Sequence, residues 1–164
     1  MSPKPKTENS TQVNLLHQAG LSKKTQLEHD DLVECLQRLE AALASPAPGR
    51  EFEWAGRAGA ELLKIEASLQ RHILSSEGEG GLFAELDLSR GAVPARVEKL
   101  RREHEQLLEH AKRLVQRIQN GEQLPDFAAI RREAADFLAA VRHHYSKEVD
   151  LIYECFWLDI GVGD

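Results

Sequence analysis

The sequence predicts an all-α protein, an up-down-up-down four-helix bundle, and three observations support this. Apolar residues recur at alternating steps of three and four along four long segments, the spacing of helices that face a bundle core. Strong helix breakers, such as the sequence SPAPG at 45–49, separate these segments. The connections are short to moderate in length, which favours antiparallel neighbours, and no stretch shows the alternation of a β-strand.

Capping residues, prolines and glycines mark the helix boundaries. The first helix is expected to begin near Ser22, a plausible N-cap, and the third to carry Pro94 in its first turn. The fourth is expected to begin near Asp126, an N-cap that follows a proline. Residues 82–92 form a connector with at most one short turn of helix. The expected helices span about 22–44, 51–76, 94–120 and 126–157, in a bundle domain at 21–158 between a flexible arm at 1–20 and a tail at 159–164.

Length and composition fit one soluble domain, because 164 residues, 41% hydrophobic and 29% charged, are enough for a sizeable core. The formal net charge of -6 does not favour nucleic acid or an anionic membrane as a partner. We find neither an apolar run for a membrane span nor a signal-peptide core, so a cytoplasmic protein is expected. Cys35 and Cys155, roughly 25 Å apart along the expected bundle axis, are too distant for a disulfide. The oligomeric state stays open.

Four of the seven histidines lie on the apolar seams of the four expected helices: His29, His72, His104 and His144. Histidine is a poor choice for an apolar seam unless something pairs with it. Their heights along the bundle can be counted from the helix ends beside the loops at Ser45 and Gly121. At about 1.5 Å per residue, the four histidines lie roughly 22 to 32 Å from that end. This spread is under two helical turns, so the imidazoles can converge and build a metal site in the bundle core.

Two glutamates lie near these histidines in the sequence. Glu148 follows His144 by four residues, so both side chains can reach one metal ion. Glu77 follows His72 by five residues and needs a widened turn to reach the same place, with Glu79 as the alternative. Four imidazoles and two carboxylates suit iron or manganese and tolerate zinc. Shared between two bridged ions, these ligands leave positions open for an oxo, hydroxo or small diatomic ligand.

The order and spacing of these residues resemble the hemerythrin-like, HHE cation-binding family. The resemblance covers roughly residues 20–157 and is carried by Glu28-His29, His72 with Glu77, Glu103-His104, and His144 with Glu148. It implies two iron ions with an oxo or hydroxo bridge, for which manganese or zinc are substitutes, and the metal ligands His29, His72, Glu77, His104, His144 and Glu148. It also implies a protein that binds or senses O2, NO or peroxide, or handles iron, rather than a classical enzyme. Oxygen-carrying members place a further histidine four residues after the third-helix ligand, where this chain has Leu108.

Two metal-free alternatives stay open from the sequence. A signalling bundle would use an exposed histidine as a phosphoacceptor, for which His110 is the candidate, and an adaptor bundle would contain only satisfied core histidines. His110 and His143 fall between seam positions and are expected to face solvent. Tyr145 is expected in a packing or surface role. The charged run at 101–103, which ends in Glu103, is expected to be a solvated helix face.

Overall fold

The computed structural model describes residues 23–86, 88–120 and 126–157, and over these ranges the chain is helical with no strand. The five helices are α2 (Lys23–Ala44), α3 (Glu51–Glu77), α4 (Leu82–Glu85), α5 (Val93–Gln119) and α6 (Phe127–Trp157). Four of them are long and α4 is a single turn inside the connector. The predicted all-α class and the four long helices are confirmed, with bounds that differ from the expected ones by one residue or so.

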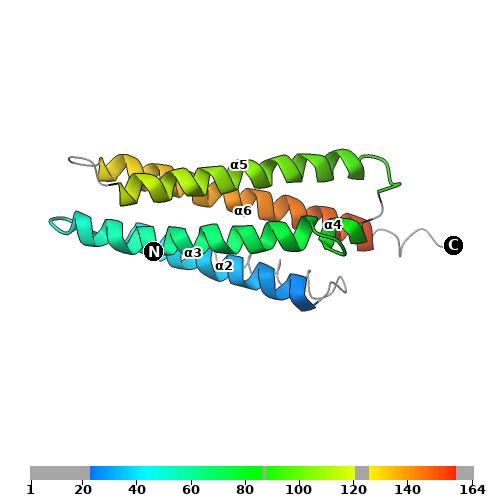
Figure 1. Ribbon diagram of the computed structural model, residues 1–164, viewed down its shortest axis with the longest axis horizontal. Coiled ribbons are helices and arrows are strands. Elements are labelled where there is room, and N and C mark those ends of the chain that lie inside the picture. The colour runs from blue at the N-terminus through cyan, green and yellow to red at the C-terminus, as the bar shows by residue number, and fades with distance from the viewer. Residues whose placement is uncertain (1–22, 87, 121–125, 158–164) are drawn as a thin grey trace, which may run out of the picture.

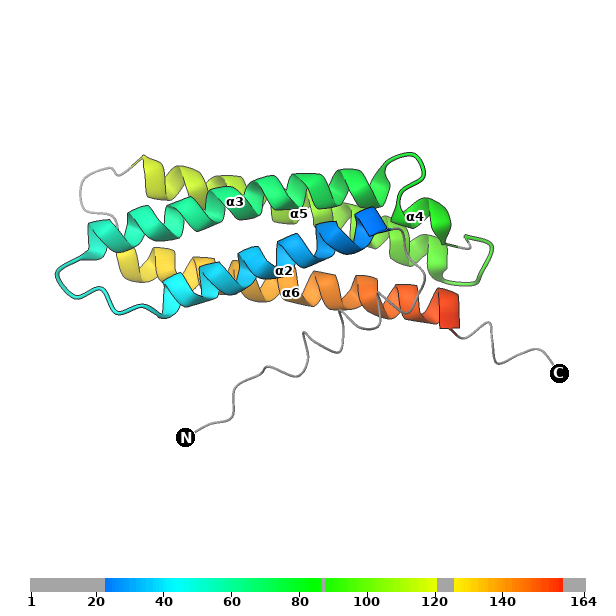
Figure 2. The ribbon, with the colours of Figure 1, turned by 90° about the horizontal axis from the view of Figure 1, so that it is seen from below.

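The four long helices run alternately in opposite directions (Figures 1 and 2). The α2–α3 loop and the end of α5 lie at one end of the bundle, which we call the loop end, and α4 lies at the other, the α4 end. Around the bundle, α3 packs against both α2 and α5, and α6 packs against both α5 and α2. This is the predicted up-down-up-down order, in which each long helix has two neighbours and turns one face to a common core.

The capping residue, proline and glycine that the sequence indicated lie at the helix ends. The Asp126 carboxylate accepts a hydrogen bond of 2.9 Å from the backbone N–H of Ala129, so it caps α6 as predicted. Helix α5 has its proline in the first turn. After α3, Gly80 has a φ of 67°, a left-handed conformation that glycine adopts without strain. The predicted arm at 1–20 and tail at 159–164 lie outside the described residues.

The buried apolar side chains form two clusters, one toward each end of the bundle. The loop-end cluster includes Leu39, Trp54, Leu62, Leu114 and Phe137. The α4-end cluster includes Leu82, Phe83, Leu100, Val149 and Ile152. Cys35 belongs to the first cluster and Cys155 to the second, and both are buried and form no disulfide, as their predicted separation required. Within the described ranges, no helix combines the length and the apolar character that crossing a membrane requires.

Candidate metal centre

The four seam histidines meet between the two apolar clusters. His29 comes from α2, His72 from α3, His104 from α5 and His144 from α6. None of the four side chains is more than marginally exposed, and Glu148 from α6 lies fully buried among them. Along α5, His104 is preceded on the seam by Leu100 of the α4-end cluster and followed by Leu107 of the loop-end cluster. The polar group is thus enclosed by apolar side chains above and below, which keep bulk water away.

The Glu148 carboxylate is the centre of this group. Its Oε2 lies 3.0 Å from Nε2 of His72 and 3.5 Å from Nε2 of His29. Its Oε1 lies 3.2 Å from Nε2 of His104 and 3.6 Å from Nε2 of His144. All four rings therefore present the same nitrogen, Nε2, to one carboxylate.

The inner atoms of this group have no hydrogen-bond partners within the described part of the chain. This holds for all four Nε2 atoms and for both carboxylate oxygens of Glu148. A buried polar atom without a partner costs roughly 1 to 3 kcal/mol, and proteins keep such atoms mainly where they serve a function. Because imidazole nitrogen and carboxylate oxygen are both metal ligands, the atoms present fit a metal ion. Donor atoms of His72, His104, His144 and Glu148 all lie within 4.8 Å of one another, and His29 joins this set through Glu148.

Three of the four imidazoles are held from behind through the outer nitrogen, Nδ1. Nδ1 of His29 donates to the backbone carbonyl of Thr25 at 2.9 Å, one turn earlier on α2. Nδ1 of His104 lies 2.6 Å from Oε1 of Glu77, and Nδ1 of His144 lies 3.0 Å from Oε2 of Glu103. A hydrogen bond at Nδ1 fixes the ring orientation and the tautomer that leaves Nε2 free to bind a metal.

The electrostatics of the centre favour the cation-binding forms of His72 and Glu148. Burial lowers the pKa of His72, so this imidazole is neutral and its nitrogen lone pair is available. Burial by itself would raise the pKa of Glu148, but the surrounding imidazoles outweigh it and hold that pKa well below its usual range. For His104, burial lowers the pKa, yet the carboxylates of Glu148 and Glu77 together leave it raised. The centre thus contains an ionised carboxylate, the charge that best offsets a cation.

A comparison with protein families gives a match over the second half of the chain. The family model of the hemerythrin HHE cation binding domain matches residues 76–156, which include Glu77, His104, His144 and Glu148. The chain belongs to the hemerythrin-like family. No curated protein and no solved structure gives a significant match. The match begins after His29 and His72, so the assignment of these two residues to the centre rests on the structure. The family and the buried His/Glu cluster together indicate that this chain binds metal cations.

Glu77 differs in its position from the other predicted ligands of the hemerythrin-like centre. It is the last residue of α3, a regular α-helix without the widened turn that the five-residue step was expected to need. Its side chain is 26% exposed and reaches the outer nitrogen of His104, on the far side of that ring from Glu148. Ser76, one turn after His72 on the same face, is buried instead. Glu79, the alternative to Glu77, is exposed.

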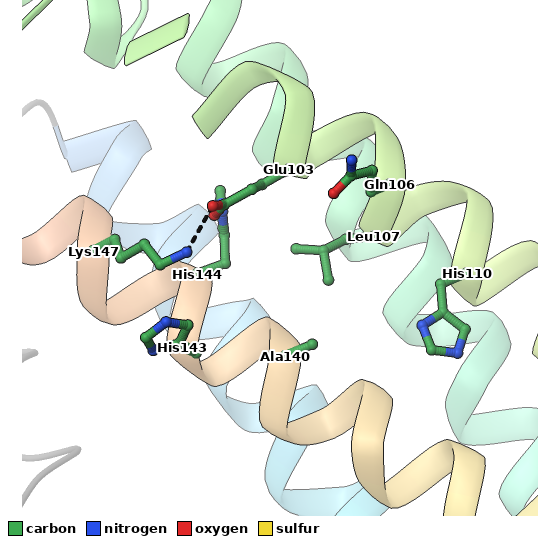
Figure 3. A pocket seen from close by; sticks show the side chains of 8 residues that line it. All are labelled: Glu103, Gln106, Leu107, His110, Ala140, His143, His144 and Lys147. Atoms are coloured by element: carbon green, nitrogen blue, oxygen red, sulfur yellow. Dashed lines mark hydrogen bonds and ion pairs between the residues drawn. The ribbon is translucent and has the colours of Figure 1, made fainter. Parts of the chain in front are cut away.

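Glu103 is the residue near the centre whose role the sequence did not reveal. The charged run at 101–103 was expected to face solvent, and this is wrong for Glu103, whose side chain is only 18% exposed. Its carboxylate lies between His144 and Lys147, with Oε1 2.6 Å from the lysine Nζ (Figure 3). The lysine and His144 together hold the pKa of Glu103 below its usual value, although burial opposes them.

His110 and His143 lie outside this cluster, and Tyr145 packs against it. His143 is exposed, as expected. His110 was expected to face solvent, but only 24% of its side chain is exposed because it packs against the Phe137 ring between α5 and α6. Tyr145 is buried with its ring centroid 5.1 Å from that of His29, which matches the expected packing role rather than a surface one.

Proposed function

We propose that this hemerythrin-like domain holds a non-haem di-iron centre and uses it to bind or sense a small molecule, either O2, NO or peroxide. The observation that supports it best is the set of four Nε2 atoms and two carboxylate oxygens, all buried, with each nitrogen 3.0 to 3.6 Å from an oxygen of Glu148, and all without a hydrogen bond in the described residues. Mixed nitrogen and oxygen donors suit iron or manganese and also accept zinc. Iron is favoured among these by the resemblance to hemerythrins, which implies two iron ions.

The residues that would hold the metal are His29, His72, His104, His144 and Glu148. The two oxygens of Glu148 face different imidazoles, and this supports a carboxylate that two ions would share. Glu77, the sixth predicted ligand, contacts a ring from outside and stands apart from these five. Iron, when bound, supplies reversible one-electron chemistry and an affinity for small diatomic molecules.

The protein contributes orientation and exclusion of water. Outer hydrogen bonds hold His29, His104 and His144 in place, and the Phe83 ring from α4 stacks on His104 at 5.8 Å with an interplanar angle of 16°. Five side chains with six donor atoms are few for two ions with six positions each, and Leu108 stands where oxygen carriers have a further histidine. Free positions and an apolar surround fit a centre that binds a small molecule.

The metal-free alternatives have less support from the site. An adaptor bundle requires core histidines whose hydrogen bonds are satisfied, whereas here four inner nitrogens crowd one carboxylate and make no hydrogen bond in the described part of the chain. A phosphotransfer bundle requires an accessible histidine. His110 lines a cavity between α5 and α6, but its side chain is only 24% exposed and its Nε2 lies 3.5 Å from the Glu133 carboxylate, whose charge would repel an incoming phosphoryl group.

Metal analysis of aerobically purified protein, with an optical spectrum, tests the proposal. We expect about two irons per chain and a near-ultraviolet absorption of ferric iron. His104→Ala and His144→Ala should each lose at least one iron, whereas His143→Ala, which changes the exposed neighbour of His144, should keep both. Adding NO, O2 or peroxide to the ferrous protein should then change the spectrum. A folded chain that refuses iron under anaerobic reconstitution, or full iron in both seam variants, would contradict the proposal.

A further inference from the structure

The Glu148 carboxylate divides the four imidazoles into two pairs. Oε2 faces His29 and His72, which we call the α2–α3 pair, at 3.5 and 3.0 Å. Oε1 faces His104 and His144, the α5–α6 pair, at 3.2 and 3.6 Å. Within each pair the ring centroids lie close together, at 4.9 Å for the first and 4.6 Å for the second. The centre therefore has two halves that share one carboxylate.

The two pairs differ in what holds their outer nitrogens. In the α5–α6 pair both Nδ1 atoms contact carboxylates, Glu77 at 2.6 Å and Glu103 at 3.0 Å. In the α2–α3 pair, Nδ1 of His29 donates to a backbone carbonyl, and Nδ1 of His72 has no partner within the described ranges. Both negatively charged partners thus serve the same half of the centre.

A negatively charged acceptor at one ring nitrogen makes the other nitrogen a stronger electron donor, because it draws the N–H hydrogen away from the ring. A neutral carbonyl has a weaker effect of the same kind, and a ring nitrogen without a partner gains no such effect. We propose that Glu77 and Glu103 are positioning residues that act through His104 and His144. By this action the α5–α6 half binds metal more tightly than the α2–α3 half. The proposal rests on the proposed metal centre. The family match does not assign these roles to either glutamate.

Lys147 adjusts this effect at one of the two rings. Its Nζ lies 2.6 Å from Oε1 of Glu103, while Oε2 of the same carboxylate faces His144 (Figure 3). The lysine charge reduces the negative charge that His144 experiences. Loss of the lysine should therefore strengthen the effect of Glu103, and loss of the glutamate should weaken binding. A residue that only supported the fold would not produce opposite changes of this kind.

The surroundings of Glu103 make it suitable for substitution. Glu103, Lys147 and His144 line a cavity of about 300 Å³ between α5 and α6, which has Leu107 and Ala140 along its wall (Figure 3). A glutamine at 103 has the size of the glutamate and room beside it, so the helices need not shift. Glu105, on the same helix and exposed, offers a matched control, because Glu105→Gln removes the same charge on the other side of His104.

Cobalt(II) titration in competition with a chelating dye, on the full chain without iron, tests the inference. We expect two steps in the wild type. Glu103→Gln and Glu77→Gln should each weaken the tighter step about 10- to 100-fold without loss of stoichiometry. Glu105→Gln should leave both steps unchanged, Lys147→Met should tighten the first step, and His29→Ala should remove only the weaker one.

The inference would be wrong if Glu103→Gln and Glu105→Gln bound metal with equal affinities. It would also be wrong if His29→Ala lost the tighter step. A lower stoichiometry in Glu77→Gln would show that Glu77 is a ligand and would overturn its role as a positioning residue. Wild-type protein that binds neither iron nor cobalt would contradict the proposed function itself. Normal metal loading with equal affinities in all three glutamine variants would contradict the asymmetry alone.

Discussion

Replacement of Glu148 by glutamine should remove the stabilisation that the metal gives while leaving the metal-free fold intact. This is the side chain that contacts all four imidazoles, and it is fully buried. Glutamine has the same shape but no charge and a weaker oxygen donor, so we expect metal affinity to fall at least about 100-fold, beyond what loss of an outer hydrogen bond costs.

The change in stability follows from the binding equilibrium. Metal at 100 times its dissociation constant stabilises the native state by about 2.7 kcal/mol. For a chain of 164 residues this raises the melting temperature by about 5 to 11 °C. After a 100-fold loss of affinity, the same metal concentration contributes only about 0.4 kcal/mol, or about 1 to 2 °C. Without metal, the variant should be no more than about 1 kcal/mol less stable than the wild type, since glutamine removes a buried charge that is costly to desolvate and the imidazoles around it can lose their protons.

Thermal unfolding with and without anaerobic ferrous iron, and after addition of a chelator, measures both quantities. Asp150→Asn is a matched control, because Asp150 is exposed two residues further along α6. It should keep the full metal-dependent shift. An equal shift in Glu148→Gln and Asp150→Asn would refute the reasoning. So would a loss of about 3 to 5 kcal/mol in the metal-free variant, which would show that Glu148 is needed for folding rather than for metal.

Two further predictions concern the packing of the bundle. The buried Ser68 hydroxyl and the Arg71 guanidinium both donate to Oδ2 of Asp31 at 2.7 Å and lower its pKa, so Asp31 adds stability above about pH 4 that is lost as the pH falls further. Asp31→Asn should cost about 1 kcal/mol in denaturant unfolding at pH 7, and the difference from wild type should shrink toward pH 3; a constant difference would contradict this. At Gly59 in α3, an added Cβ would lie 2.8 Å from Cγ2 of Ile118, so Gly59→Ala should destabilise by about 1 to 3 kcal/mol despite its better helix propensity. The cost should be smaller in an Ile118→Ala background, and a double-mutant cycle without coupling would count against the clash.

The fold and the meeting of the histidines could be predicted because both depend on positions along single helices. Seam spacing shows which face of a helix is buried, and residue counts give the height of each seam position in the bundle. These two coordinates sufficed to bring His29, His72, His104 and His144 together. The prediction for α6 was equally direct, because His144 and Glu148 are one turn apart on one seam.

The outer contacts could not be predicted because they depend on how far one helix lies from the next. Glu103 immediately precedes His104 and points about 100° away from the seam, so a helical projection places it toward solvent. In the bundle that direction faces α6, where His144 and Lys147 are within reach. Glu77 likewise contacts a ring on α5 rather than one on its own helix. A carboxylate directly beside a seam histidine is the sequence signal that would have pointed to Glu103.

The position of the centre explains how the protein tolerates so many buried polar atoms without partners. The free-energy cost of these polar atoms is confined to one layer of the bundle. In this layer His104 and His144 are flanked by Leu107 and Val141 of the loop-end cluster and by apolar residues of the α4-end cluster. The loop-end cluster continues over several turns of all four long helices and contains no unpaired imidazole. Burial of this apolar surface stabilises the bundle independently of the centre, at about 25 cal/mol per Å². The metal-free chain is therefore expected to stay folded from its loop end, and metal binding should order mainly the layer of the histidines and the α4 end beyond it.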